Sequence, residues 1–209
     1  MVNSAETYLK EMPLVAILRG IKPDEVVAIG SELINAGFKA IEVPLNSPDP
    51  LESIKRLVNA FGSKCLIGAG TVLTPDAVEA VDGAGGKLIV TPNTDPNVIE
   101  KAVSLGLLPM PGMATATEAL TAVKAGATHL KLFPAGTYGK GHIGALKAVL
   151  PINTKIYAVG GVSPDNLAEW LSAGADGVGF ASNLYKPGLT AADVAENAKH
   201  MITAYKTAQ

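Results

Sequence analysis

Short apolar segments recur along the chain, and each is followed by turn residues and then by an amphipathic stretch. This repeat is typical of β-strands that alternate with α-helices in a parallel sheet. Eight such strands are predicted, at residues 14–20, 40–45, 66–72, 87–93, 108–113, 129–135, 155–161 and 177–184.

Helix boundaries are marked by two kinds of signal. Proline-containing turns are expected to open helices near Pro23-Asp24-Glu25, Asn46-Ser47-Pro48, Thr74-Pro75-Asp76 and Ser163-Pro164-Asp165. Glycine supplies a left-handed cap without a Cβ penalty, and glycines that precede the next strand are expected to end helices at Gly37, Gly85, Gly106, Gly126 and Gly174. A last helix is predicted over residues 190–206, and a short one over residues 1–11.

The β-then-α units continue without a linker or a shift in composition, which predicts one domain over residues 1–209. The expected architecture is an α/β fold, a single (βα)8 TIM barrel whose bottom is closed by the short N-terminal helix. A doubly wound open sheet is the alternative, because periodicity does not show closure. In a barrel, chemistry is carried at the C-terminal ends of the strands.

Composition narrows the expected partners and location. The 209 residues carry a formal net charge of −2, which gives no reason to expect nucleic acid or a membrane surface. Cys65 is the only cysteine, so no intrachain disulfide can form and a reducing, cytoplasmic compartment is expected. Residues 1–11 lack a signal-peptide core, and no apolar stretch approaches the roughly 18 to 20 residues of a membrane span.

Lys131 is the sharpest chemical signal, because it lies between Leu130 and Leu132 in an apolar strand. Burial disfavours the ammonium form and lowers the pKa of a lysine, so a neutral amine there can attack a ketone and form a Schiff base. The alternative is a lysine that reaches solvent or pairs with a carboxylate. That alternative is expected for Lys87 and Lys155, which begin their strands.

Glu42 is the second signal, an acidic residue within the segment AIEVPL. A carboxylate inside a barrel is costly unless it is paired or used, and beside an amine it can move protons. A plain buried ion pair with Lys131 or Arg19 is the alternative. Three buried charges near strand ends, Arg19, Glu42 and Lys131, favour a site over a lone structural pair.

A phosphate site is expected after the last two strands. Gly160-Gly161 permits close backbone approach to an anion, and Ser182-Asn183 is expected to begin a short helix whose amides point at it. Ordinary turn glycines are the alternative. No metal is expected, because His129, His142 and His200 lie far apart without ligand spacing.

The segments ILRG, IEVPLN, IGAGTV, VTPN, KLFPA and AVGGV occur in this order within residues 13–206. Together they resemble the 2-keto-3-deoxy-6-phospho-sugar acid aldolases, and the resemblance covers nearly the whole chain. It implies a class I aldolase without a cofactor that splits its small-molecule substrate into pyruvate and D-glyceraldehyde 3-phosphate. It also implies a homotrimer.

The resemblance assigns a role to each matching residue. It implies that Lys131 forms the Schiff base, that Glu42 is the general acid and base, and that the Thr71 hydroxyl holds the pyruvate portion. Phe133 would pack beside the imine. The remaining substrate-binding positions would be Arg19, Pro92, Val159, Gly160, Gly161 and Ser182, of which Gly161 and Ser182 match the phosphate-binding positions.

Two positions separate the subfamilies that the chain resembles. Phosphogluconate-type enzymes carry an arginine where this sequence has Asn46, so the substrate carboxylate would bind Arg19, as in the phosphogalactonate type. Those gluconate enzymes also carry threonine where this chain has Val159. Both departures favour the phosphogalactonate substrate over its C4 epimer, which is the alternative. A phosphosugar isomerase, a thiamin-phosphate-synthase-like barrel and a non-catalytic phosphate-binding barrel are the rival hypotheses.

Overall fold

Nine parallel strands form a single sheet in the computed structural model, which describes residues 4–209. Their order in the sheet is β5-β4-β3-β2-β1-β9-β8-β7-β6. The strands are β1 (Leu14–Ile17), β2 (Ala40–Pro44), β3 (Leu66–Gly70), β4 (Leu88–Val90), β5 (Leu108–Met110), β6 (Gly112–Met113), β7 (His129–Leu132), β8 (Lys155–Val159) and β9 (Gly177–Phe180).

The sheet wraps into a nearly closed barrel. β1 pairs with both β2 and β9, so the first and last strands are neighbours, and the doubly wound alternative is wrong. The predicted strand at 108–113 is divided at Pro111, with β5 paired to β4 and β6 paired to β7. Proline has no amide to donate to the ladder. Its carbonyl still accepts a hydrogen bond from the Lys131 amide at 2.8 Å.

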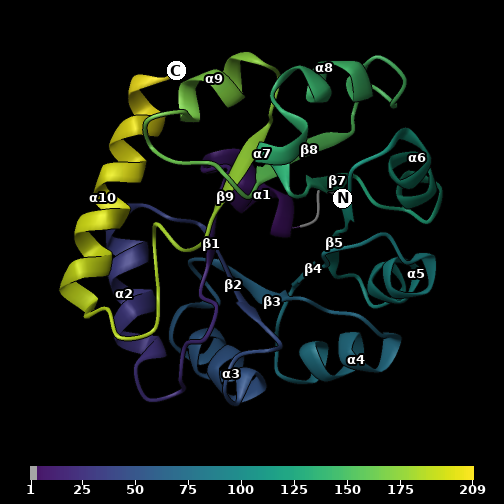
Figure 1. Cartoon of the computed structure of the whole chain (residues 1–209). Helices are drawn as coiled ribbons and strands as arrows, with labels where there is room; N and C mark the ends of the chain where they lie inside the picture. Colours follow the sequence, from purple (N-terminus) through teal and green to yellow (C-terminus); the bar gives the residue numbers. More distant parts are fainter. Residues whose placement is uncertain (1–3) are drawn as a thin grey trace.

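Helices surround the ring of strands, and α10 lies beside α2 (Figure 1). They are α2 (Val26–Ala36), α3 (Pro50–Phe61), α4 (Pro75–Gly83), α5 (Pro96–Ser104), α6 (Ala116–Lys124), α7 (Ala135–Tyr138), α8 (Gly141–Lys147), α9 (Leu167–Ser172) and α10 (Ala191–Thr207). The five predicted capping glycines all have positive φ, from 70° to 120°. Among residues 4–209, no helix has both the length and the apolar character that a bilayer span requires.

The predicted helix starts are only partly confirmed. Thr74 caps α4, where its hydroxyl accepts a hydrogen bond from the Ala77 amide at 3.2 Å. The helix expected near Asn46-Ser47-Pro48 begins two residues later than the signal, because α3 starts at Pro50 after Asp49. The side-chain oxygens of Asn46 and Ser47 accept hydrogen bonds from the loop after β1 instead, so they are not available as caps.

The helix α1 (Ser4–Glu11) closes one end of the barrel; residues 1–3 of the predicted 1–11 helix lie outside the described residues. Figure 1 draws α1 in the middle of the ring of strands. Its side chains of Ala5, Tyr8 and Leu9 pack against an inner apolar cluster that includes Leu66 and Tyr157. A separate, larger cluster fills the space between the strands and the outer helices.

Strand register identifies the side chains that face the barrel interior. Tyr157 belongs to the inner cluster and is in register with Lys131 on the neighbouring strand. On β2 the inner residue is Ala40, and strand alternation places Glu42 on the same face. Glu42 and Lys131 therefore both point into the barrel, beyond the apolar layer that α1 covers.

Candidate active site

Glu42 is a buried carboxylate near the C-terminal end of β2, with a relative exposure of 2%. Its Oε2 atom has no hydrogen-bond partner. Burial raises the pKa of Glu42 to about 7, and the positive charges of Lys131 and Arg19 only partly oppose this effect. A carboxyl that is half-ionised near neutral pH can both take up and release protons, as an acid/base catalyst must.

Glycines at inward positions make room for the side chains of neighbouring strands. A Cβ atom placed on Gly70 of β3 would lie 1.9 Å from Oε2 of Glu42. On β9, a Cβ on Gly179 would lie 2.9 Å from Cγ2 of Val159 and 3.3 Å from Cδ1 of Ile17. Glycine two residues apart in LIGAG and GVGF is a signal of close approach that the sequence reasoning did not use.

Lys131 lies on β7 at 6% relative exposure, and burial lowers its pKa. The Glu42 charge opposes this shift and the Arg19 charge adds to it. Within residues 4–209 neither a hydrogen bond nor an ion pair joins Lys131 to Glu42, so a plain buried pair does not describe them. Nζ lies 4.7 Å from the centroid of the Phe133 ring.

The lysines that begin two other strands reach solvent and pair with carboxylates, as the sequence predicts. Lys87 is exposed and forms an ion pair with Asp82 at 2.9 Å. Lys155 is also exposed and pairs with Asp176 at 3.2 Å. Burial without a carboxylate partner therefore distinguishes Lys131 from the lysines that begin strands.

Arg19 is exposed, so the expectation of a third buried charge is wrong. It follows the last residue of β1, Ile17, and lies beyond the barrel interior at the mouth. Its Nη1 donates to Oδ1 of Asn46 at 2.6 Å, and its Nη2 donates to Oγ1 of Thr71 at 3.4 Å. Side chains that follow three neighbouring strands thus meet around one guanidinium.

Thr71 has a backbone φ of 56°, in the left-handed region. β-branched residues rarely adopt this conformation, and such strain is concentrated at functional sites. The residue directly follows β3, whose last residue is Gly70. Its hydroxyl accepts the hydrogen bond from Nη2 of Arg19, which agrees with a role in holding substrate.

The glycine pair after β8 is held in a defined shape. Gly160 and Gly161 have φ values of 88° and 84°, and a Cβ on Gly160 would lie 3.5 Å from the Phe133 ring. The Gly160 carbonyl accepts a hydrogen bond from the Gly136 amide at 2.8 Å, and the Gly161 carbonyl accepts from Nδ2 of Asn166 at 2.9 Å. Both carbonyls are thus engaged, and among the described residues the Gly161 amide has no acceptor.

The short helix expected at Ser182-Asn183 is wrong. The chain forms a single turn there, in which the Ala181 carbonyl accepts from the amides of Leu184 and Tyr185 at 2.8 and 2.9 Å. Pro187 has no backbone amide hydrogen to donate, and Gly188 has a φ of 96°, so no helix continues. Ser182 is exposed on this turn.

The loops after β8 and β9 are tied together. Nδ2 of Asn183 donates to the Val162 carbonyl at 2.8 Å. This contact holds the turn of Ser182 beside the Gly160-Gly161 pair, and the structure therefore places the predicted phosphate-binding residues together without a helix. Asn183 was predicted only as part of a short helix with Ser182, and Asn166 was not among the predicted site residues. Neither amide side chain was predicted to brace these loops.

Pro92 is half-buried after β4 and borders the strand pair that carries Lys131. A Cβ on Gly112 would lie 2.4 Å from the Pro92 carbonyl oxygen, and Gly112 is in register with Lys131. The Gly112 amide donates to Oγ1 of Thr91 at 3.2 Å. The segment VTPN therefore supports the position of Lys131 through β6.

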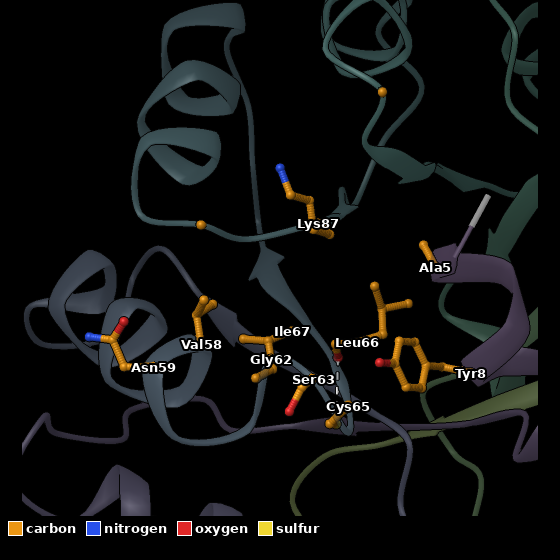
Figure 2. Close-up of a pocket in the computed structure, with 12 residues that line it drawn as sticks. Ala5, Tyr8, Val58, Asn59, Gly62, Ser63, Cys65, Leu66, Ile67 and Lys87 are labelled. Carbon is orange, nitrogen blue, oxygen red and sulfur yellow. Dashed lines mark hydrogen bonds between the residues drawn. The ribbon is translucent and has the colours of Figure 1, made fainter.

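Two cavities lie at the opposite end of the barrel, and neither includes Glu42 or Lys131. One, of about 540 Å³, is lined by Ala5 and Tyr8 of α1, Leu66 at the start of β3 and Lys87 before β4 (Figure 2). The other, of about 570 Å³, is lined by His129 and Lys155 at the starts of β7 and β8. In barrels the N-terminal ends of strands serve stability, so the site is assigned to the end with Glu42 and Lys131.

Residues 5–200 match the model of the KDPG and KHG aldolase family. The chain is 51% identical to the 2-dehydro-3-deoxy-6-phosphogalactonate aldolase of Escherichia coli (strain K12), over 95% of this chain and 97% of that protein. It is 50% identical to a probable enzyme of the same name from Rhizobium meliloti (strain 1021), over 93% of this chain and 92% of that protein. A solved structure described as native KDPGal superposes with a TM-score of 0.93 at 51% identity, over 95% of this chain and 96% of that one. The chain therefore belongs to the KDPG and KHG aldolase family and is an aldolase, a carbon–carbon lyase.

Proposed function

We propose that this chain cleaves 2-dehydro-3-deoxy-6-phosphogalactonate to pyruvate and D-glyceraldehyde 3-phosphate by a class I, Schiff-base mechanism. The observation that carries the proposal is Lys131, a buried lysine with a lowered pKa that faces Glu42 across the barrel without pairing to it. The names of the two relatives that are half identical in sequence support the choice of substrate.

Substrate binding begins at the mouth of the barrel. The guanidinium of Arg19 pairs with the C1 carboxylate of the keto acid, because a planar fork of N–H donors suits a carboxylate. The Thr71 hydroxyl, which contacts Arg19, lies at the same place and holds the pyruvate portion. This arrangement directs the C2 ketone toward Nζ of Lys131.

Imine formation uses the two buried groups together. The neutral amine of Lys131 attacks C2, and proton transfer from nitrogen to oxygen gives a carbinolamine. Glu42 in its protonated form donates a proton to the C2 hydroxyl, water leaves, and the protonated imine remains. A carboxyl whose pKa is about 7 is present in both protonation states at neutral pH, so it can serve each direction.

Cleavage uses the ionised form of Glu42. The carboxylate takes the proton of the C4 hydroxyl, C4 becomes the aldehyde carbon, and the C3–C4 bonding electrons move to C3 and the imine. Glyceraldehyde 3-phosphate leaves, and Lys131 carries the enamine of pyruvate. Protonation at C3 and hydrolysis of the imine release pyruvate and restore the amine.

The phosphate group binds at the loops after β8 and β9. The Gly161 amide and the exposed Ser182 hydroxyl are the donors for its oxygens, and Gly160 allows the backbone to approach. Phe133 lies between this loop and Lys131, so it packs beside the imine and joins the two halves of the site.

The deciding experiment compares kcat/KM for pyruvate release from 2-keto-3-deoxy-6-phosphogalactonate and from its gluconate epimer. A galactonate preference supports Arg19 as the carboxylate ligand and Val159 as one of the residues that select the configuration at C4. A gluconate preference would leave the Lys131 chemistry intact and refute the choice of epimer. If the protein cleaves neither compound, both substrate assignments are refuted.

Reductive trapping tests the mechanism separately from the substrate. Borohydride added with pyruvate is expected to attach a three-carbon acid to Lys131, which peptide mass spectrometry localises. A phosphosugar isomerase or a phosphate-binding barrel has no need of an imine and would give no adduct. An adduct on another lysine would also contradict the proposal.

The architecture and assembly follow the same proposal. β5 and β6 act as one strand interrupted at Pro111, so the whole chain is a single (βα)8 domain of residues 1–209. It is a cytoplasmic homotrimer without a metal or organic cofactor.

Association of subunits is supported by exposed apolar side chains on two neighbouring helices, Val103 on α5 and Leu120 on α6. Sedimentation equilibrium measures the subunit number, and a monomer would contradict it.

A further inference from the structure

Two adjacent residues of the loop after β2 brace two adjacent residues of the loop after β1. Oδ1 of Asn46 accepts a hydrogen bond from Nη1 of Arg19 at 2.6 Å, and Oγ of Ser47 accepts one from the Gly20 amide at 2.9 Å. Asn46 thus holds the end of the arginine side chain while Ser47 holds the backbone directly after it. Both contacts join residues 27 positions apart in sequence.

The backbone on both sides of Arg19 is also fixed by packing. Leu18 and Ile21 are fully buried, and a Cβ on Gly20 would lie 2.7 Å from the Pro187 ring. The backbone that carries Arg19 therefore has little freedom, whereas its long side chain is exposed and free to rotate unless something orients it. Among residues 4–209, its side chain forms hydrogen bonds with Asn46 and Thr71.

Both contacts of the guanidinium are with neutral acceptors. Within residues 4–209 no carboxylate lies within ion-pair distance of Arg19. An amide oxygen and a hydroxyl occupy one N–H group each on two different nitrogens, and neither adds a negative charge that would neutralise the guanidinium. A carboxylate at the same place would position the guanidinium equally well but would neutralise it.

We propose that Asn46 is a positioning residue, which orients the guanidinium of Arg19 toward the keto-acid carboxylate while leaving its charge available. This inference rests on the proposed function, in which Arg19 binds that carboxylate. Preorganisation of a charged side chain reduces the entropy lost on binding, so Asn46 contributes to affinity without touching the reacting atoms. An acidic residue would defeat the arrangement by competing with the substrate for the same N–H groups.

The experiment measures pyruvate affinity as the half-saturating concentration for borohydride trapping on Lys131. Asn46→Ala is expected to raise that concentration about 5- to 10-fold, the effect of losing one ordinary hydrogen bond at an exposed position. Asn46→Asp keeps the acceptor and adds a charge, and it is expected to weaken pyruvate binding by at least as much. Trapping at saturating pyruvate and the melting temperature are expected to stay near wild type in both variants. Asn59→Ala, on the exposed face of α3, is the matched control and should change nothing.

A double-mutant cycle separates positioning from general packing. In an Arg19→Met background, Asn46→Ala is expected to have no further effect on pyruvate affinity. The same fold-loss in both backgrounds would overturn the inference, and so would wild-type affinity in the Asn46→Asp variant. Unchanged affinity in Arg19→Met alone would instead refute the proposed role of Arg19. Loss of affinity in Arg19→Met but not in Asn46→Ala would refute only the role of Asn46.

Discussion

Oε2 of Glu42 occupies the space that a side chain on Gly70 would take, since a Cβ there would lie only 1.9 Å from it. Cδ and Oε1 of the same carboxyl would lie 2.4 and 2.5 Å away. The carboxyl is buried in β2 and in contact with the neighbouring strand β3, so it cannot move aside freely. The identity of residue 70 therefore fixes where the proposed acid/base group lies.

Gly70→Ala is expected to displace the Glu42 carboxyl and reduce kcat by about 10²- to 10⁴-fold, the range for losing a positioned acid or base. Overpacking of this kind also costs roughly 1–3 kcal/mol of unfolding free energy. Gly83→Ala is the control, because a Cβ at that helical position meets no atom within 4 Å. Steady-state kinetics and urea unfolding of both variants test this, and full activity of Gly70→Ala would show that the carboxyl can relocate.

Glu42→Gln is expected to change the pH dependence of stability. The folded-state pKa of Glu42 is raised to about 7 from 4.5, so the folded protein favours the protonated form. The wild type is therefore most stable, relative to the variant, below pH 4.5, and it loses that stability as pH rises through 7. We compare the unfolding free energy of the variant minus that of the wild type. This difference should be up to roughly 3 kcal/mol larger at pH 8 than at low pH.

Urea unfolding of the wild type and the Glu42→Gln variant at pH 4 and pH 8 gives this difference directly. Subtracting the unfolding free energy of one protein from that of the other removes the contributions of all other titrating groups that the substitution leaves unchanged. A difference that does not change between the two pH values would mean that Glu42 titrates alike in the folded and unfolded chain. The variant is also expected to lose aldolase activity in the same range as Gly70→Ala.

Lys131→Met is expected to abolish imine formation without loss of the fold. Burial lowers the pKa of Lys131 below that of a lysine in the unfolded chain, so below the ordinary lysine pKa this residue costs stability that a methionine of similar length avoids. The melting temperature of the variant at pH 6 should equal or exceed that of the wild type, while borohydride with pyruvate gives no adduct. Lys87→Met, at an exposed position, should keep full activity. A lower melting temperature for Lys131→Met would assign this lysine a structural role as well.

Much of the fold was predictable because strand and helix signals are local. The glycine caps have the positive φ values that the sequence implies, and Thr74-Pro75 opens a helix as expected. The break at Pro111 was not predicted, because the run at 108–113 reads as one apolar strand, and only the pairing partners show that it divides.

The candidate site was predictable where burial alone decides the chemistry. A lysine and a glutamate within apolar strands are unusual on sequence grounds, and the structure buries both, facing the same interior. Arg19 was misjudged, since its position beyond the strand end exposes it. The contacts of Asn46 and Asn183 join distant loops, and no local pattern in the sequence indicates which carbonyl or guanidinium an amide side chain will reach.

Val159→Thr is expected to shift selectivity toward the gluconate epimer. Val159 is buried at 6% exposure on β8 and is in register with Gly179, where a Cβ would lie 2.9 Å from Cγ2 of Val159. Threonine has nearly the same shape and adds one hydroxyl, which can hydrogen-bond a C4 hydroxyl of the other configuration. A contact of about 1.4 kcal/mol would change the ratio of the two kcat/KM values about 10-fold. Val149→Thr, at a position 56% exposed, should leave the ratio unchanged. An unchanged ratio in Val159→Thr, with normal stability, would mean that C4 is selected elsewhere in the site.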